Sequence, residues 1–143
     1  MTENTENAQK NQTLERLRNI LDNMECRHIK NDGAIYAMFH NENNGKTLAC
    51  LFTAGEVKIQ AAAWMAGVSC DDERRVEGLE FCNQWNCERV NPRAYIDGDG
   101  DLRVDMTLFE IEGLTDEYLE ENFVRLFFST ANQFYDEAAS KFA

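Results

Sequence analysis

The sequence lacks the features that mark secreted, zinc-binding or membrane-spanning proteins. Its cysteines are odd in number and include no CxxC pair, which disfavours both a disulfide framework and a zinc site. No apolar run approaches the roughly 20 residues that cross a bilayer, and residues 1–12 are polar and acidic rather than signal-like. We therefore expect reduced thiols, no membrane association, no metal or other cofactor, and a cytoplasmic location.

Basic residues are also scarce. The 143 residues include 14 Lys and Arg against 26 Asp and Glu, for a formal net charge of -12. This charge repels phosphate backbones, so nucleic-acid binding is not expected. Ten acids fall between Asp97 and Glu121, where Arg103 is the only basic residue. We expect them to concentrate negative charge at one end of the fold, either steering a basic partner or forming a solvated face that aids solubility.

The length fits one domain, and the first half of the chain predicts a helix followed by strands. Residues 1–12 are too polar to bury themselves and are expected to be disordered, leaving 13–143 as a single domain. Thr13 is a candidate N-cap for a first helix. Apolar residues then recur at helical spacing, at Leu14, Leu17, Ile20, Leu21 and Met24. Three strand-like runs, 34–40, 47–53 and 56–64, follow with short turns that favour antiparallel pairing.

The second half predicts a helix, a hairpin and a long helix. A helix starting near residues 69–72 presents one apolar side, made by Val76, Leu79, Cys82 and Asn86 with Phe81 and Trp85 beside it. Pro92 ends it and opens a strand over 93–96. The turn 97–101 leads to a strand over 102–109 whose apolar residues alternate with polar ones. The expected fold is therefore α+β, an antiparallel sheet of about five strands with three helices in the order α-β-β-β-α-β-β-α.

Two apolar series follow the last helix, which Thr115 is expected to cap. Leu119, Phe123, Phe127, Ala131, Phe134 and Ala138 form the first series, and Phe128, Tyr135 and Phe142 form the second. A helix with two apolar flanks is typically covered on both. We interpret the second flank as a candidate contact with a second subunit, and expect a homodimer.

The run of aspartates after the expected strand 93–96 resembles part of a calcium-binding loop. Asp97, Asp99 and Asp101 match its positions one, three and five. Position six would be Leu102 rather than glycine, and position twelve is Leu108 rather than a bidentate glutamate. Glycine and aspartate suit the positive φ of tight turns, so the run predicts a hairpin.

The other motifs are weaker. Residues 45–47 read Gly-Lys-Thr, but His40 stands where a phosphate-binding loop needs glycine, and a strand follows instead of a helix. His28 and His40 have no partner at a spacing that makes a recognisable site. Cys70 adjoins a helix start, which would lower the pKa of a thiol, although a plain helix-entry residue is the simpler interpretation.

These elements and several local motifs resemble the YbjN-like family, whose fold is similar to that of type III secretion chaperones. Residues 83–86, Asn-Gln-Trp-Asn, resemble the paired asparagines at the end of that family's middle helix. Residues 93–102 resemble its aromatic strand and Asp/Gly hairpin, and 114–127 the start of its final helix. The resemblance spans roughly residues 14–138 and is strongest from Leu79 onward.

The resemblance implies a noncatalytic regulatory or chaperone-like protein, of the kind described as a bacterial sensory transduction regulator, that binds a protein partner of unknown identity. Asn83 and Asn86 are expected to satisfy backbone groups where the helix meets the following strand. Aromatic residues anchor interfaces disproportionately. The candidate contact residues are Trp64, Trp85, Phe109, Phe128 and Tyr135, each with core packing as its alternative.

Two other functions stay open. A true type III secretion chaperone would hold an effector segment extended along the domain, which the size and acidity allow. An enzyme would need acids, histidines or thiols that converge in one pocket, for example His40 and Cys50 with an aspartate.

Overall fold

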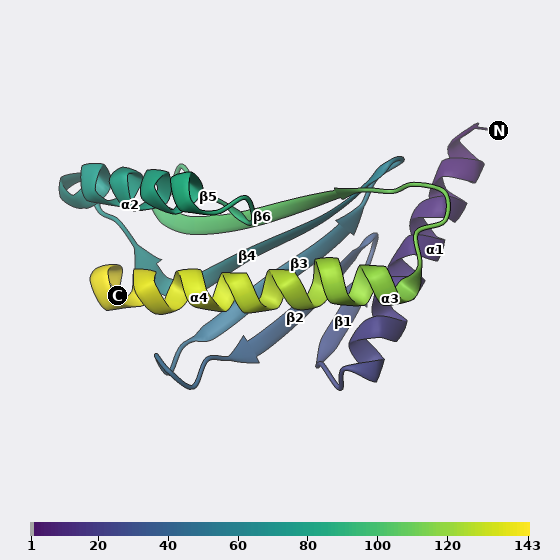
Figure 1. Cartoon of the computed structure of the whole chain (residues 1–143), viewed down its shortest axis with the longest axis horizontal. Helices are drawn as coiled ribbons and strands as arrows, with labels where there is room; N and C mark the ends of the chain where they lie inside the picture. Colours follow the sequence, from purple (N-terminus) through teal and green to yellow (C-terminus); the bar gives the residue numbers. More distant parts are fainter. Residues whose placement is uncertain (1) are drawn as a thin grey trace.

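One antiparallel sheet of six strands organises the chain, in the order β1-β2-β3-β4-β6-β5 (Figure 1). The computed structural model describes the backbone of residues 2–143 and the side chains of residues 8–143. The helices are α1 (Thr2–Asn23), α2 (Arg75–Glu88), α3 (Asp116–Leu119) and α4 (Arg125–Phe142). A short 3₁₀ helix, η1 (Asp72–Arg74), precedes α2, and a π-helical segment, η2 (Glu120–Val124), joins α3 to α4. The strands are β1 (His28–Asn31), β2 (Ala34–His40), β3 (Thr47–Ala54), β4 (Lys58–Ser69), β5 (Arg93–Ile96) and β6 (Asp101–Phe109).

The predicted α+β class and antiparallel sheet are confirmed, with one more strand than the approximate five. The extra strand, β1, pairs with β2 around the Asp32–Gly33 turn, placing Ile29 opposite Tyr36. Four residues with a single apolar side chain are too few for alternation to reveal a strand. Pairing with β2 is what makes this segment extended.

The first helix begins at Thr2 instead of at Thr13, so it runs through the segment for which the sequence predicts disorder. Thr13 is therefore a buried interior residue of α1 and does not cap it. Its hydroxyl contacts the Gln9 carbonyl at 3.1 Å and donates to Glu110 Oε1 at 2.7 Å. This contact ties α1 to the far end of β6.

The helices cover one face of the sheet and leave the other without a layer of its own (Figure 1). In β2 the inward side chains Ile35 and Ala37 are 0% and 1% exposed, whereas Tyr36 and Met38 on the opposite face are 42% and 63% exposed. Side chains of successive strand residues point to opposite faces. The described residues thus form two layers, with the core between the sheet and the helices.

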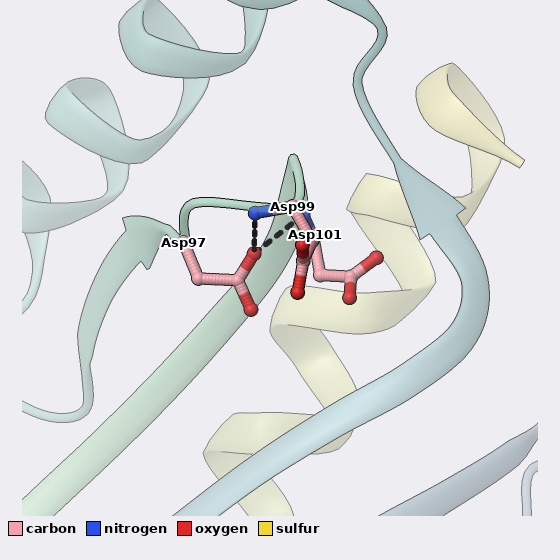
Figure 2. A group of neighbouring side chains, drawn as sticks. All are labelled: Asp97, Asp99 and Asp101. Carbon is pink, nitrogen blue, oxygen red and sulfur yellow. Dashed lines mark hydrogen bonds between the residues drawn. The ribbon is translucent and has the colours of Figure 1, made fainter.

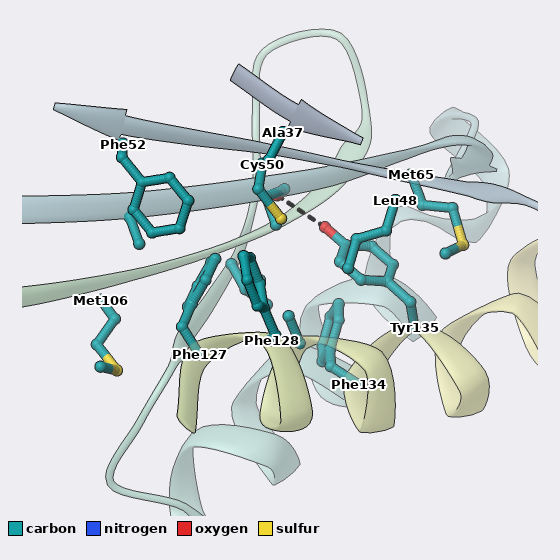
Figure 3. Close-up of a cluster of buried hydrophobic side chains, with 14 of the residues drawn as sticks. Ala37, Leu48, Cys50, Phe52, Met65, Met106, Phe127, Phe128, Phe134 and Tyr135 are labelled. Atoms are coloured by element: carbon teal, nitrogen blue, oxygen red, sulfur yellow. Dashed lines mark hydrogen bonds between the residues drawn. The ribbon is translucent and has the colours of Figure 1, made fainter. Parts of the chain in front are cut away.

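Both apolar series of the last helix lie in this core. Thr115 caps the helix as predicted, accepting a bond from the Tyr118 N–H at 3.1 Å. The Phe128 and Phe52 ring centroids are 5.7 Å apart (Figure 3). The Phe128 ring centroid is also 4.4 Å from that of Phe39. Because the chain itself covers this second flank, the flank gives no support to a dimer contact.

The apolar side of α2 is turned relative to the predicted one. Val76 and Leu79 are exposed, and the buried residues are Gly78, Cys82 and Trp85. A Cβ at Gly78 would lie 2.5 Å from Cys70 Sγ and 2.7 Å from an Ile96 methyl carbon. At this glycine the helix packs closely against Cys70 and Ile96, a contact that apolar spacing does not reveal.

The expected concentration of acids at one end of the fold is wrong. The aspartates of residues 97–101 lie at the start of β6, and the acids of residues 110–121 follow its end. Eight strand residues, 102–109, lie between Asp101 and Glu110, a span of about 30 Å at the usual strand rise.

Candidate protein-binding surface

The five aromatic residues predicted as contacts divide between core and surface. Trp85, Phe128 and Tyr135 are buried in the core. Trp64 is partly exposed and lies on the sheet face that the helices leave uncovered, and Phe109 is exposed at the end of the same face. Only these two are placed to touch a partner of the folded chain.

Strand register gathers apolar side chains around Trp64. Trp64 lies opposite Ala49 on β3, which lies opposite Met38 on β2. The adjacent row places Ala62 opposite Leu51, and Leu51 opposite Tyr36. We call this surface the open face, and its central residues are Tyr36, Met38, Ala49, Leu51, Ala62, Trp64, Tyr95 and Arg103.

The apolar centre of the open face is unusual for a sheet with one uncovered side. Such antiparallel sheets normally present polar side chains to solvent. Here Met38 and Ile29 are 63% and 70% exposed, and they border a hollow of about 240 Å³ lined also by Arg27, His28 and Tyr36. Contiguous exposed apolar patches on soluble proteins mark interaction sites.

Charged side chains at the β6 side of the open face are paired within the chain. Arg93 Nη2 lies 2.6 Å from Asp105 Oδ2, and this hydrogen bond raises the pKa of the Arg93 guanidinium. Arg103 lies 3.6 Å from an Asp97 oxygen, and its guanidinium carbon is 5.0 Å from the Trp64 ring centroid. These pairs leave this part of the face close to neutral on a chain of charge -12.

The groups named for an enzyme do not converge. His40 occupies the same face of β2 as Met38, whereas Cys50 lies on the core face of β3 opposite Ala37. Burial raises the pKa of the Cys70 thiol, against the activated thiolate that a helix start would favour, and it raises the pKa of Cys82 to about 11. Low-pKa, accessible thiols are the reactive ones, so these two are poor nucleophiles.

The aspartate run forms the predicted hairpin (Figure 2). Asp97 Oδ1 accepts bonds from the N–H groups of Asp99 and Asp101 at 2.9 and 3.0 Å, and the Gly100 N–H donates to the Asp97 carbonyl. Oxygens of the three carboxylates lie within 4.8 Å of one another. Burial, and then the nearby Asp97 and Asp99 carboxylates, raise the pKa of Asp101.

The asparagine motif has the predicted structural role at one of its two positions. The Asn86 side chain donates to the Ala94 carbonyl at 3.0 Å and accepts from the Ala94 N–H at 2.9 Å, joining α2 to β5. Trp85 Nε1 donates to the Pro92 carbonyl at 3.0 Å. Asn83 is exposed and makes no such side-chain bond among the described residues.

Sequence reasoning missed Tyr36 and Met38 as surface residues. Their alternation with Ile35 and Ala37 was the available signal, because one of the two sets must face away from the core. Which strands lie beside β2, and hence which residues extend the patch, depends on pairing between distant segments.

Three comparisons with known proteins complete the description. The family model YbjN, described as "Putative bacterial sensory transduction regulator", matches residues 13–140. A solved structure described as "Crystal structure of YbjN, a putative transcription regulator from E. coli" superposes with a TM-score of 0.69 at 18% identity, covering 89% of this chain and 91% of that one. That likeness shows the fold alone. No curated protein matches, and none of the helices in residues 2–143 has the length and apolar character to span a membrane.

Proposed function

This chain belongs to the YbjN family, and from that premise we propose that it is a noncatalytic cytoplasmic regulator that acts by binding protein and assembles as a homodimer through its open face. The observation that carries the proposal is the apolar centre of the uncovered sheet, where Tyr36 and Met38 stand exposed beside Trp64. Five free cysteines fit a reducing compartment.

A second copy is the occupant that charge favours at the open face. Two chains of charge -12 repel each other over most of their surfaces. At the β6 side of the open face the arginines are matched by Asp105 and Asp97, so approach there brings together nearly neutral surfaces. The same net charge disfavours regulation through direct contact with nucleic acid.

The size of the open face also suits a dimer. Strands about 4.8 Å apart that rise about 3.3 Å per residue give this sheet a flat area of roughly 700 Å². A standard interface removes about 800 Å² of accessible surface from each partner. The accessible surface of the open face is larger than its flat area, because side chains project from the sheet. Two sheets packed face to face would bury the exposed Met38 side chain and the exposed Tyr36 ring.

The test is the oligomeric state of a charge-insertion variant in sedimentation velocity. Met38→Glu places one carboxylate per subunit in the proposed contact, twice across a two-fold axis, where its burial without a partner is costly. We expect a dimer for the native chain at micromolar concentration and a folded monomer for the variant. Val90→Glu adds the same charge at a 95% exposed site outside the open face and should stay dimeric. A monomeric native chain, or a Met38→Glu dimer, would overturn the dimer proposal.

A further inference from the structure

A groove of about 380 Å³ lies between α2 and the C-terminal part of α4, on the helix side of the sheet. Its floor is aromatic, made by Phe81, Trp85 and Phe142. The Phe81 and Phe142 rings are 5.6 Å apart at their centroids, and Trp85 lies 5.2 Å from the core residue Phe134. The floor is therefore held by packing and is continuous with the core.

The rim of the groove is acidic. Glu77, Glu80 and Glu88 come from α2 and Glu137 from α4, and Lys141 is the single basic residue among those that line it. Arg74 pairs with Glu77 at 3.0 Å. Among residues 8–143, Glu80, Glu88 and Glu137 have no ion-pair partner. Three carboxylates thus stand unneutralised above an aromatic floor.

The chain's own cations already lie against the rings that form the floor. Within the groove, Lys141 Nζ is 5.4 Å from the Phe81 ring centroid. Arg74 and Arg89, which are not among the residues that line the groove, have guanidinium carbons 4.7 Å from the ring centroids of Phe142 and Trp85, respectively. Cations are attracted to the faces of such rings within about 6 Å. These contacts are evidence, separate from the acids, that the floor accepts positive side chains.

We infer that this groove binds a basic amphipathic segment of a partner protein. Apolar side chains of the segment pack on Phe81 and Phe142, and its lysines or arginines meet Glu80 and Glu137, with one cation replacing Lys141 on the Phe81 ring. The acidic rim excludes phosphate-bearing ligands by the same charge that attracts the segment. This inference deepens the proposed function, because it names the chemistry of the bound partner.

The groove and the open face lie on opposite sides of the sheet. A dimer formed through the open face would leave the grooves of both subunits uncovered, so assembly and partner binding do not compete. The two sites are therefore separable by mutation.

The test uses a fluorescently labelled amphipathic helix of lysine and leucine as the probe, followed by anisotropy at low salt. A scrambled peptide of identical composition is the probe control. We expect the double variant Glu80→Gln with Glu137→Gln to weaken binding by about tenfold or more, since its two charges face the segment directly. Glu112→Gln with Glu117→Gln removes two exposed charges elsewhere and should change affinity less than about twofold.

Lys141→Ala gives a sharper expectation. Removing the cation that occupies the Phe81 ring should tighten binding several-fold, about what a cation–π contact is worth. Lys58→Ala, which removes a positive charge from the other side of the sheet, should have little effect. A general attraction between a basic peptide and an acidic protein predicts equal effects for both.

The inference fails if the two glutamate pairs weaken binding equally, if the scrambled peptide binds as well as the amphipathic one, or if the native chain binds neither. Met38→Glu separates the groove from the open face. If the monomeric Met38→Glu chain still binds the peptide, the result supports the groove as the binding site. If Met38→Glu abolishes peptide binding, the peptide binds to the open face and the inference is overturned.

Discussion

The Tyr135 hydroxyl lies 2.7 Å from the carbonyl oxygen of Leu102, across the core from α4 to β6. It also lies 2.9 Å from the Ala63 carbonyl of β4. The β4–β6 register shifts between Trp64 and Ser69, just beyond Ala63. The one hydrogen of this buried hydroxyl is therefore within hydrogen-bonding distance of two carbonyl oxygens, at the point where the ladder between these strands becomes irregular.

We predict that Tyr135→Phe destabilises the domain by about 0.5–1.5 kcal/mol, because it removes a buried hydrogen bond while keeping the ring. Urea unfolding followed by circular dichroism measures the change. Tyr36→Phe, which removes a hydroxyl from the exposed open face, is the matched control and should unfold like the native chain. Equal stability of both variants would show that the hydroxyl contributes nothing.

A second prediction concerns the close approach of α2 to the sheet. Gly78→Ala places a methyl group against Cys70 Sγ and Ile96, so we expect a loss of about 1–3 kcal/mol from overpacking. The same substitution at Gly98 meets nothing within 4 Å and requires no positive φ, so its effect should be small or stabilising. The urea midpoints of the Gly78→Ala and Gly98→Ala variants measure the difference. If Gly78→Ala unfolds at the same urea concentration as the native chain, α2 can shift to accommodate the methyl group and the prediction is wrong.

A third prediction follows from the raised pKa of Asp101, whose causes are burial and then the neighbouring Asp97 and Asp99. A carboxyl group with a higher pKa in the folded state opposes folding while it is ionised. Asp101→Asn should therefore raise the melting temperature near pH 7, and the gain should vanish as pH falls below the ordinary value of 3.8, where the native side chain is protonated in both states.

Thermal melts between pH 7 and pH 3 measure the effect of Asp101→Asn. Glu112→Gln, which removes an exposed acid beyond the other end of β6, reports the general effect of lowering the net charge. A melting temperature that is unchanged at pH 7, or a gain that persists at pH 3, would contradict the prediction.

Local chemistry explains what could be predicted. Thr115 caps its helix, residues 97–101 make the hairpin, and the alternation in residues 102–109 marks the core side of β6, because each depends on neighbours within a few residues. The local pattern of asparagines and aromatic residues also pointed to the family that the comparison identified.

Features that depend on distant segments could not be predicted in the same way. Four residues become β1 because β2 lies beside them, and α2 presents Gly78 rather than Val76 to the core because the glycine allows close approach to Cys70 and Ile96. Phe128 and Tyr135, candidates for a second subunit, are covered by Phe39, Phe52 and strand carbonyls of the same chain.

The sequence by itself thus determined the class of fold, most of its elements and the acidic charge. Periodicity is a property of short segments, and net charge is a sum over all residues, so neither depends on tertiary contacts. Tertiary structure alone decided which apolar side chains remain exposed. Strand register assembled Tyr36, Met38 and Trp64 into the open face, and helix docking brought Glu80 and Glu137 to one groove. Residues far apart in the chain form a surface only when tertiary packing brings them together, and no local sequence pattern specifies that packing.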